Sequence, residues 1–223
     1  MLYIIPTPIG NLKDITFRAL GTLQNVDEIL AEDTRVTRKL LDHYQISKPI
    51  RSYHAHNEHK IFPTLISDMS KGKTYGLVSD AGTPAISDPG FLLVRACYQS
   101  KIKVVPLPGP TALIAAVAGS GLPADRFHFE GFLPHKKGRN KRLEFLATYP
   151  YTIVLYESPY RLLKTIKDIQ SVFGEERRVC VVKEISKIYE KFTLDYPENL
   201  ITNFEEETKI KGEFVLVIEG DSK

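Results

Sequence analysis

Short apolar runs alternate with longer amphipathic segments along the first half of the chain. The runs at 2–5, 29–31, 75–78 and 103–106 have the length of buried strands. Apolar residues three and four positions apart predict helices at 34–43, 61–69, 89–99 and 112–119, and a first helix that ends at Leu23 with Asp14 or Thr16 as its cap. Strands and helices that alternate at this spacing indicate a mainly parallel sheet flanked by helices.

The second half of the chain also contains both strands and helices, but they do not alternate as regularly as in the first half. We expect strands at 127–129, 151–156, 178–182 and 213–218, and helices at 141–147 and 161–173. The segment 183–194 is typical of an antiparallel return strand. Gly119–Pro123 is the best candidate for a boundary. We therefore predict two α/β domains, 1–119 with a mainly parallel sheet and 120–223 with a mixed sheet.

The composition of the 223 residues is that of an ordinary folded protein, with 43% hydrophobic and 26% charged residues, which excludes disordered and fibrous classes. No apolar run approaches the roughly 18 residues of a membrane span, and the first residues lack the features of a signal peptide. We therefore expect a cytoplasmic protein. Cys97 and Cys180 stand alone in apolar segments, so we expect buried, inert thiols.

Three loops rich in glycine and proline each follow a predicted strand and precede a predicted helix, at Pro6–Asn11, Ser79–Gly90 and Leu107–Thr111. The carboxyl ends of parallel strands share one edge of a sheet, where open α/β folds bind ligands, so we expect the loops to line one pocket. The alternative is that they only make turns. The chain has neither a P-loop nor a Gly-x-Gly-x-x-Gly fingerprint, which disfavours NTP hydrolysis and hydride transfer. Stiff proline loops suit a flat, largely uncharged heterocycle better than a polyphosphate.

These loops and several later motifs resemble the ribosomal RNA small subunit methyltransferase I family of the tetrapyrrole methylase superfamily. The resemblance runs in order through Ile5–Leu12, Ala31–Arg35, Ser79–Pro84, Ser87–Gly90, Pro106–Pro110, Glu130–Pro134, Tyr156–Ser158 and Lys211–Glu213. It implies a two-domain tetrapyrrole-methylase-like α/β fold and a homodimer. It also implies 2′-O-methylation of a cytidine ribose in small-subunit ribosomal RNA, without a metal. Many members continue with a small helical extension, which we expect this protein to lack.

The resemblance further implies that S-adenosylmethionine, the methyl donor, binds in a cleft between the two domains. Asp80 stands where the wider superfamily has a Gly-Asp-Pro loop, but Ser79 and Ala81 replace that glycine and proline. We expect a change in the detailed contacts there. The predicted donor-binding residues are Pro8, Ile9, Asp80, Gly82, Thr83, Pro108, Thr111, Ala112 and Tyr156.

Methyl transfer to a ribose hydroxyl needs alignment of the attacking oxygen, and a base within hydrogen-bond reach would assist it. Glu32, Asp33 and Glu157 are the candidate catalytic residues, because each follows an apolar strand. Each also has a structural alternative: Asp33 can cap a helix, Glu32 can pair with Arg35, and Glu157 can orient a loop.

Basic residues predict an RNA-binding surface that contacts phosphates without reading bases. Three of them share a predicted helix face, and five lie in a stretch without an acid; the alternative for both is an ordinary solvated surface. The predicted RNA-binding residues are Arg35, Arg38, Lys39, Lys136, Lys137, Arg139, Lys141 and Arg142.

Two aromatic residues, Tyr53 and Phe132, could stack on an extruded base, although most aromatic residues belong to the core. His54, His56 and His59 match no zinc motif, so we expect a loop near the substrate and no metal. Two other functions stay open: a tetrapyrrole or other small-molecule methylase of the same superfamily, and an RNA-binding protein without turnover.

Overall fold

The computed structural model describes residues 1–221 and divides the chain into two compact units, one over Met1–Thr111 and the other from Ala112 onward. The division lies before helix α5 (Ala112–Gly119), whereas we predicted it after that helix. The helix packs on strands of the second unit and buries Leu113, Ala116 and Val117. Because α5 is apolar on every side, its sequence does not indicate which unit it joins.

The first unit is built on a five-stranded sheet in the order β3-β2-β4-β1-β5, with every neighbouring pair parallel. Strands β2 and β4 are buried at every position, as expected of a sheet covered on both faces. The predicted parallel sheet is confirmed. Its strands are β1 (Leu2–Ile4), β2 (Glu28–Ala31), β3 (Ile50–Ser52), β4 (Tyr75–Val78) and β5 (Val104–Pro106).

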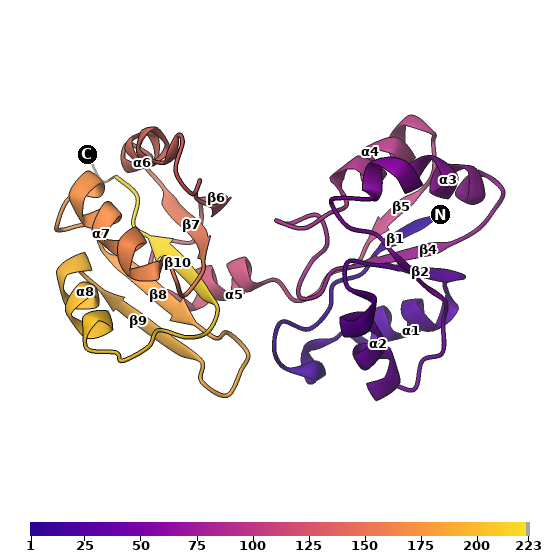
Figure 1. The fold of residues 1–223 in the computed structure, drawn as a ribbon, viewed down its shortest axis with the longest axis horizontal. Helices are drawn as coiled ribbons and strands as arrows, with labels where there is room; N and C mark the ends of the chain where they lie inside the picture. The colour runs from indigo at the N-terminus through magenta and orange to yellow at the C-terminus, as the bar shows by residue number, and fades with distance from the viewer. Residues whose placement is uncertain (222–223) are drawn as a thin grey trace. The chain divides into compact units, whose positions relative to one another are not determined.

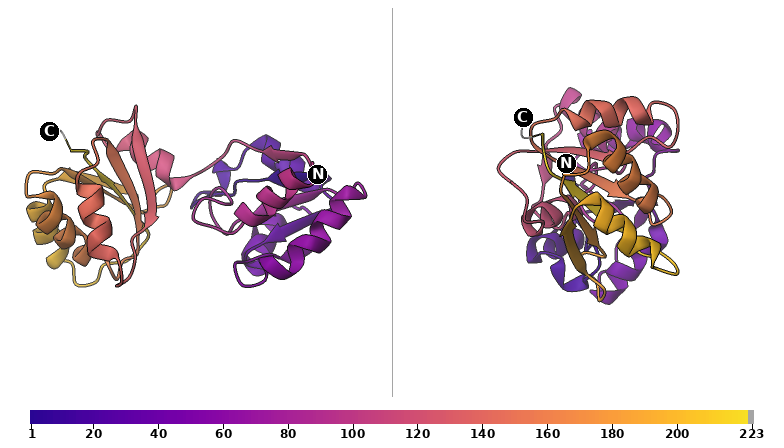
Figure 2. Two further views of the ribbon diagram at one scale, coloured as in Figure 1. Left: turned by 90° about the horizontal axis from the view of Figure 1, so that it is seen from above. Right: turned by 90° about the vertical axis from the view of Figure 1, so that its left-hand side faces the viewer.

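Helices cover both faces of this sheet (Figures 1 and 2). One core cluster joins α1 and α2 to the sheet through residues such as Leu23 and Leu41, and another joins α3 and α4 through Leu65 and Leu93. Of the two candidate caps, Thr16 caps α1, since its hydroxyl accepts the Ala19 N–H at 3.0 Å. The helices are the 3₁₀ turn η1 (Leu12–Asp14), α1 (Phe17–Asn25), α2 (Thr34–His43), α3 (Glu58–Ser70) and α4 (Phe91–Gln99).

The second unit contains a mixed five-stranded sheet in the order β6-β7-β10-β8-β9. Strands β6 and β7 are parallel, while the other neighbours are antiparallel, which confirms the predicted mixed sheet. The return strand expected within 183–194 is β9. The strands are β6 (Phe127–Phe132), β7 (Thr152–Glu157), β8 (Val179–Lys183), β9 (Lys191–Asp195) and β10 (Phe214–Ile218).

Three helices cover one face of this second sheet, and α5 packs on the other (Figure 1). Leu143, Ile166 and Leu200 bring the three helices into one core with the sheet. On the opposite face α5 approaches β9 closely at Gly119, where a Cβ atom would lie 2.6 Å from the ring of Phe192. The three helices are α6 (Arg139–Ala147), α7 (Leu162–Phe173) and α8 (Pro197–Glu205), the last of which the sequence pattern did not predict.

Both cysteines are buried, as expected, and burial raises the pKa of the Cys97 and Cys180 thiols to about 11. Thiols with so high a pKa stay protonated near neutral pH and are poor nucleophiles. Within residues 1–221, every helix is too short or too polar to cross a membrane.

Candidate functional site

The three glycine- and proline-rich loops meet at the carboxyl edge of the first sheet. Thr7 and Gly82 exchange two backbone hydrogen bonds, of 2.9 and 3.0 Å, which join the first loop to the second. The Thr83 hydroxyl donates to the Pro110 carbonyl at 2.9 Å, which joins the second loop to the third. A Cβ atom at Gly109 would lie 2.6 Å from Pro6, so the third loop also packs against the first. The three loops therefore lie in contact with one another, although the third contributes no residue to the cavity beside them.

Gly82 occupies the centre of this arrangement with a φ of +86°, in the left-handed region that favours glycine. The position of a Cβ atom there is 3.4 Å from the Ile9 side chain and 3.8 Å from the Pro110 carbonyl oxygen. Four of the predicted donor-binding residues, Pro8, Ile9, Gly82 and Thr83, therefore belong to one local arrangement. Pro108 is exposed on the third loop, and Thr111 is half-buried at the end of that loop.

A small cavity of about 230 Å³ opens beside these loops, between the first loop and helix α2. Pro8, Leu12, Val36 and Leu40 give it an apolar wall, while Asp80 and Lys39 bring one charge of each sign. It thus combines predicted donor-binding positions with one predicted RNA-binding position. The lining residues are Thr7, Pro8, Leu12, Val36, Thr37, Lys39, Leu40, Ser79 and Asp80.

Asp33 caps helix α2. Its carboxylate accepts the Arg35 backbone N–H at 2.8 Å and forms a two-pronged ion pair with the Arg35 guanidinium, the shorter contact being 2.6 Å. The side-chain hydrogen bond with Arg35 is the main reason why the pKa of Asp33 falls to about 2. A carboxylate with so low a pKa is a weak base, so the geometry favours the capping alternative over proton transfer.

Glu32 lies in a different environment, together with two other acids. Burial raises its pKa, and the nearby charge of Asp80 adds to that effect. Asp80 is held in place by the Asp33 backbone N–H, which donates to its Oδ1 at 3.0 Å. Burial, with the charges of Glu32 and Asp80, also raises the pKa of Asp88 to about 6. The carboxyl ends of β2 and β4 thus carry three mutually repelling carboxylates.

Asp88 is a site residue that our sequence reasoning missed, although it lies within the Ser87–Gly90 motif. The sequence shows an acid in a loop, but not that Glu32 and Asp80 lie near it. His54, which follows β3, lies near enough to Glu32 for its charge to lower the pKa of that carboxyl, against the larger effect of burial. Its Nδ1 is buried and has no hydrogen-bond partner among the described residues.

Glu157 lies at the end of β7 and is 3% exposed. Its carboxylate accepts hydrogen bonds from the Ser158 N–H at 2.7 Å, the Arg161 guanidinium at 2.8 Å and the Thr165 hydroxyl at 2.7 Å. These bonds fix the connection from β7 to α7, which matches the loop-orienting alternative. The group is buried and its oxygens are occupied, which leaves it poorly placed for proton transfer to a substrate.

Helix α2 presents a cationic face. Arg38 and Lys39 are exposed, and the Arg35 side chain is 85% exposed even though it pairs with Asp33. The predicted grouping of these three residues on one helix is confirmed. The helix also lines the small cavity, so its cations lie beside the converging loops.

Arg139 departs from the prediction of an RNA-binding residue. It is 4% exposed, and its guanidinium donates to Asp168 Oδ2 at 2.9 Å, Thr165 Oγ1 at 2.8 Å and the Pro134 carbonyl at 3.3 Å. A guanidinium that is buried and saturated in this way cannot reach a phosphate. Arg139 instead ties the start of α6 to α7.

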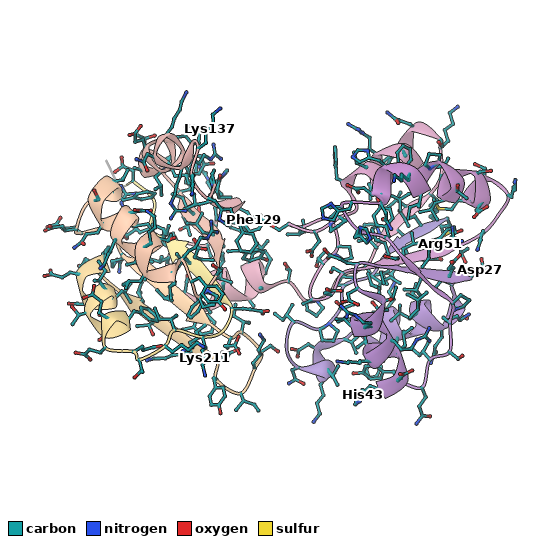
Figure 3. The ribbon with its side chains drawn as sticks, in the orientation of Figure 1. Asp27, His43, Arg51, Phe129, Lys137 and Lys211 are labelled. Atoms are coloured by element: carbon teal, nitrogen blue, oxygen red, sulfur yellow. The ribbon has the colours of Figure 1, made fainter. Side chains whose placement is uncertain are left out.

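The other basic residues of the segment 136–142 comprise one paired arginine and three exposed lysines. Arg142 pairs with Glu130 and lies over the Phe145 ring, 4.8 Å from its centroid, so its charge is largely neutralised. The remaining lysines are exposed, and Lys137 extends away from the second unit (Figure 3). The cations that stay accessible here are Lys136, Lys137 and Lys141.

The two aromatic candidates also differ from each other. Tyr53 is 1% exposed and its hydroxyl donates to Glu58 at 3.0 Å, so it belongs to the core and cannot stack on a base. Phe132 is 55% exposed and its ring meets that of Tyr156 at 5.7 Å. Tyr156 is half-buried on β7, and Ala112 begins α5; both belong to the second unit.

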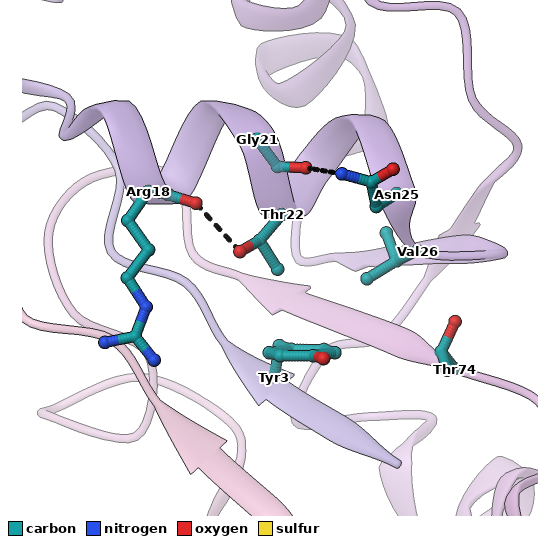
Figure 4. A pocket seen from close by; sticks show the side chains of 7 residues that line it. All are labelled: Tyr3, Arg18, Gly21, Thr22, Asn25, Val26 and Thr74. Carbon is teal, nitrogen blue, oxygen red and sulfur yellow. Dashed lines mark hydrogen bonds between the residues drawn. The ribbon is translucent and has the colours of Figure 1, made fainter.

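No three metal-binding side chains gather closely enough to hold an ion anywhere in residues 1–221. A second depression, of about 360 Å³, lies beside α1 (Figure 4). In it the Thr22 hydroxyl bonds the Arg18 carbonyl at 2.8 Å, and the Asn25 amide bonds the Gly21 carbonyl at 2.7 Å. Its lining includes none of the predicted site residues, so the loops remain the candidate site.

A family model described as tetrapyrrole (corrin/porphyrin) methylases matches residues 1–195. The chain is 52% identical over 221 residues to a ribosomal RNA small subunit methyltransferase I of Synechocystis, covering 99% of this chain and 79% of that protein. It is 50% identical to the protein of the same name from Escherichia coli O157:H7, over 98% of this chain and 77% of that one. The Thermotoga maritima protein is 45% identical, with 98% of both chains covered.

Solved structures give the same fold at lower identity. A cobalt precorrin-4 methyltransferase matches with a TM-score of 0.70 and 21% identity, over 97% of this chain and 93% of that chain. A uroporphyrin-III-C-methyltransferase from Thermus thermophilus matches with a TM-score of 0.67 and 18% identity, over 98% and 93% of the two chains. These matches confirm the predicted architecture.

Proposed function

The chain belongs to the tetrapyrrole methylases and, among them, to the ribosomal RNA small subunit methyltransferase I family, and we propose that it methylates a cytidine ribose 2′-hydroxyl in small-subunit (16S) ribosomal RNA. It is an S-adenosylmethionine-dependent methyltransferase. The observation that carries the proposal is the near-full-length similarity to relatives of that name, at an identity far above that to the small-molecule methylases.

The converging loops fit a nucleoside-type methyl donor. Gly82 leaves space beside Ile9 and Pro110 that any other side chain would enter, and the prolines present an apolar wall. None of the three loops contains a lysine or arginine that would hold a polyphosphate. The nearest cations that we identify are those of helix α2. S-adenosylmethionine supplies an already activated methyl group when bound. The proposed donor-binding residues are Pro8, Ile9, Asp80, Gly82, Thr83, Pro108, Thr111, Ala112 and Tyr156.

Glu32 is the proposed proton acceptor for the ribose hydroxyl. Of the three carboxylates considered, Asp33 is committed to capping α2 and Glu157 to the turn after β7. The pKa of Glu32 is raised by burial and by the charge of Asp80, which makes it a stronger base than an ordinary glutamate. Asp80, held in place by the Asp33 backbone N–H, supplies the charge that adds to the effect of burial.

The exposed cations form the proposed RNA-binding surface. Those on α2 stand beside the loops, and those before and within α6 carry no acid among their immediate neighbours in sequence. Such residues attract phosphates without specifying bases. The surface comprises Arg35, Arg38, Lys39, Lys136, Lys137 and Lys141, with Arg142 in a minor role because it pairs with Glu130.

We also propose that the protein acts in the cytoplasm, where ribosomal subunits are assembled, and that it forms a homodimer. The relatives' substrate supports the first proposal, and the family resemblance supports the second. We propose no metal ion and no membrane as a partner of this protein.

Calorimetry and methyl transfer together test this function. The protein should bind S-adenosylmethionine, and Thr83→Arg should abolish binding because the new side chain enters the contact with Pro110, while Thr64→Arg at an exposed position of α3 serves as the matched surface control. Labelled methyl groups should pass to isolated small ribosomal subunits and not to a porphyrinoid. Transfer to the porphyrinoid alone would establish the small-molecule methylase, and donor binding without any transfer would establish an RNA-binding protein without turnover.

A further inference from the structure

Strand β6 is an edge strand of the sheet in the second unit and carries a β-bulge (Figure 1). Its register with β7 shifts between Phe129 and Gly131, so Glu130 is an extra residue on β6. Gly131 supports the bulge with a φ of +72°, in the left-handed region that favours glycine. Side chains alternate along a regular strand, so Phe129 and Phe132 would otherwise point to opposite faces of the sheet. The bulge allows both to point to the same face.

Three aromatic rings meet on that face, near the carboxyl ends of β6 and β7. The centroid of the Tyr156 ring lies 5.0 Å from that of Phe129 and 5.7 Å from that of Phe132, and both contacts are edge to face. Leu155 belongs to the core beneath α6, α7 and α8, so the rings lie on the face opposite these helices. Phe129 and Tyr156 are half-buried, whereas Phe132 is 55% exposed. Two rings thus support a third that is largely open to solvent.

The backbone that follows Phe132 is fixed by two arginines. Leu133 is 2% exposed, and its carbonyl accepts a hydrogen bond from the Arg161 guanidinium at 3.0 Å. The Pro134 carbonyl accepts a hydrogen bond from the buried Arg139 at 3.3 Å. An aromatic ring on so constrained a backbone loses little freedom when a ligand covers it, which lowers the cost of binding.

Exposed cations follow the rings closely along the chain. Lys136 is four residues after Phe132, so their Cα atoms are at most about 14 Å apart, and Lys136 and Lys137 are both exposed. The sequence contains no acid between Phe132 and Arg142. The nearest acid before the rings' last member, Glu130, accepts a hydrogen bond from Arg142 at 2.6 Å, so its charge is neutralised. The surface that continues from the rings is therefore cationic.

We propose that Phe132, supported by Phe129 and Tyr156, is a stacking platform for an unpaired base of the RNA substrate. The phosphates beside that base contact Lys136 and Lys137. Aromatic rings beside cations are the usual combination in proteins that bind single-stranded nucleic acid, because every base has a flat face and every nucleotide has a charge. The bases of a duplex already stack on one another, so only an unpaired base can occupy this place. This inference deepens the proposed function and rests on it.

Other occupants fit this surface less well. Lysine is depleted at protein–protein interfaces, yet two exposed lysines follow the platform, which disfavours a protein partner. The adenine of the methyl donor is also flat, and Tyr156 is among the proposed donor-binding residues. However, S-adenosylmethionine carries no phosphate, so the two lysines match a polynucleotide better. An RNA strand uses both the exposed ring and the cations.

Fluorescence anisotropy with a labelled single-stranded RNA of about 12 nucleotides tests the platform. Phe132→Ala should weaken binding about 5- to 100-fold, and Phe132→Leu should lose most of the same factor, because leucine keeps apolar bulk but offers no ring face. Phe132→Tyr should bind like the wild type. Phe17→Ala is the matched control, since that ring is 94% exposed in the first unit, and it should not change the affinity. Each variant should keep the wild-type circular dichroism spectrum, because both positions are exposed.

Salt dependence and donor affinity separate stacking from the other roles. Stacking releases no counterions, so Phe132→Ala should leave the slope of log affinity against log salt unchanged. Lys136→Ala should instead reduce that slope by roughly 0.7, the value of one phosphate contact with a single strand. The affinity of Phe132→Ala for S-adenosylmethionine, measured by calorimetry, should equal that of the wild type.

An RNA affinity that Phe132→Ala leaves unchanged, or that Phe132→Leu retains in full, overturns the platform. A loss of donor affinity without a loss of RNA affinity also overturns it and assigns the ring to the donor. Methyl transfer by the wild type to small ribosomal subunits tests the proposed function separately. A wild type that methylates the subunits but binds no single-stranded RNA overturns the platform alone, and one that does neither overturns both. RNA binding with the expected losses but without transfer supports the platform and contradicts the proposed function.

Discussion

The stability of the first unit should depend on pH through Asp88. This half-buried carboxyl lies near Glu32 and Asp80, and burial with those two charges raises its pKa from 3.8 to about 6. A carboxyl whose pKa is higher in the folded protein than in the unfolded chain binds its proton more tightly when folded. Its ionisation therefore lowers the free energy of unfolding as the pH rises from about 4, the pKa in the unfolded chain, to about 6, the pKa in the folded protein. Above pH 6 the whole of this destabilisation is present.

The size of the effect follows from the shift. One pKa unit corresponds to about 1.4 kcal/mol, so a shift of roughly two units sets an upper value of about 3 kcal/mol. Asp88→Asn removes the ionisation while it keeps the size of the side chain. At pH 7.5 the variant should have a free energy of unfolding higher than the wild type by about 1–3 kcal/mol, and near pH 4 the difference should be close to zero.

Urea unfolding followed by far-ultraviolet circular dichroism, at pH 4, 5, 6 and 7.5, measures this difference. Asp125→Asn is the matched control, since that side chain is 80% exposed in the second unit. A difference for Asp88→Asn that does not change with pH, or that grows as the pH falls, would refute the account of three repelling carboxylates. A titration of the Asp88 carboxyl by carbon-13 NMR with a midpoint below pH 4.5 would do the same.

Three further outcomes follow from the same contacts. Glu157→Gln should lower the free energy of unfolding by about 1–3 kcal/mol in urea titrations, because it leaves the half-buried Arg161 guanidinium without its carboxylate partner; an unchanged free energy of unfolding would contradict that role. Gly82→Ala should cost about 1–2 kcal/mol, since alanine is strained at a φ of +86°, and calorimetry should show weaker donor binding. Reversing the charges of Lys136 and Lys137 should reduce the slope of RNA affinity against salt by roughly 0.7–0.9 per lost phosphate contact; an unchanged slope would remove both from the RNA surface.

The sequence predicted the elements best where local pattern and burial agree. Helix 34–43 and strand 75–78 have the predicted bounds, because a capping aspartate and a continuous apolar run mark them clearly. The meeting of the three loops also followed from the sequence, since parallel strands leave their carboxyl ends at one edge. Strand β3 and helix α8 were missed: β3 is a half-buried run of three residues, and α8 begins at a proline after a short polar turn.

The site residues whose surroundings the sequence did not predict have one feature in common. Their burial depends on partners far along the chain. Arg139 lies in a basic stretch, yet its main ion-pair partner is Asp168, 29 positions away. Asp88 looks like an ordinary loop acid until the fold places it near Glu32. Tyr53 resembles an exposed aromatic in a polar segment, but it is buried in the core. Local composition contains no information about such distant neighbours.

The most direct test of the proposed function is a map of ribose methylation on small-subunit ribosomal RNA from cells with and without this protein. We expect one cytidine to carry a 2′-O-methyl group only when the protein is present, and the purified protein with S-adenosylmethionine to restore that mark on unmethylated subunits. Identical maps from both kinds of cell, together with no transfer to the purified subunits, would contradict the assignment of ribosomal RNA as the substrate.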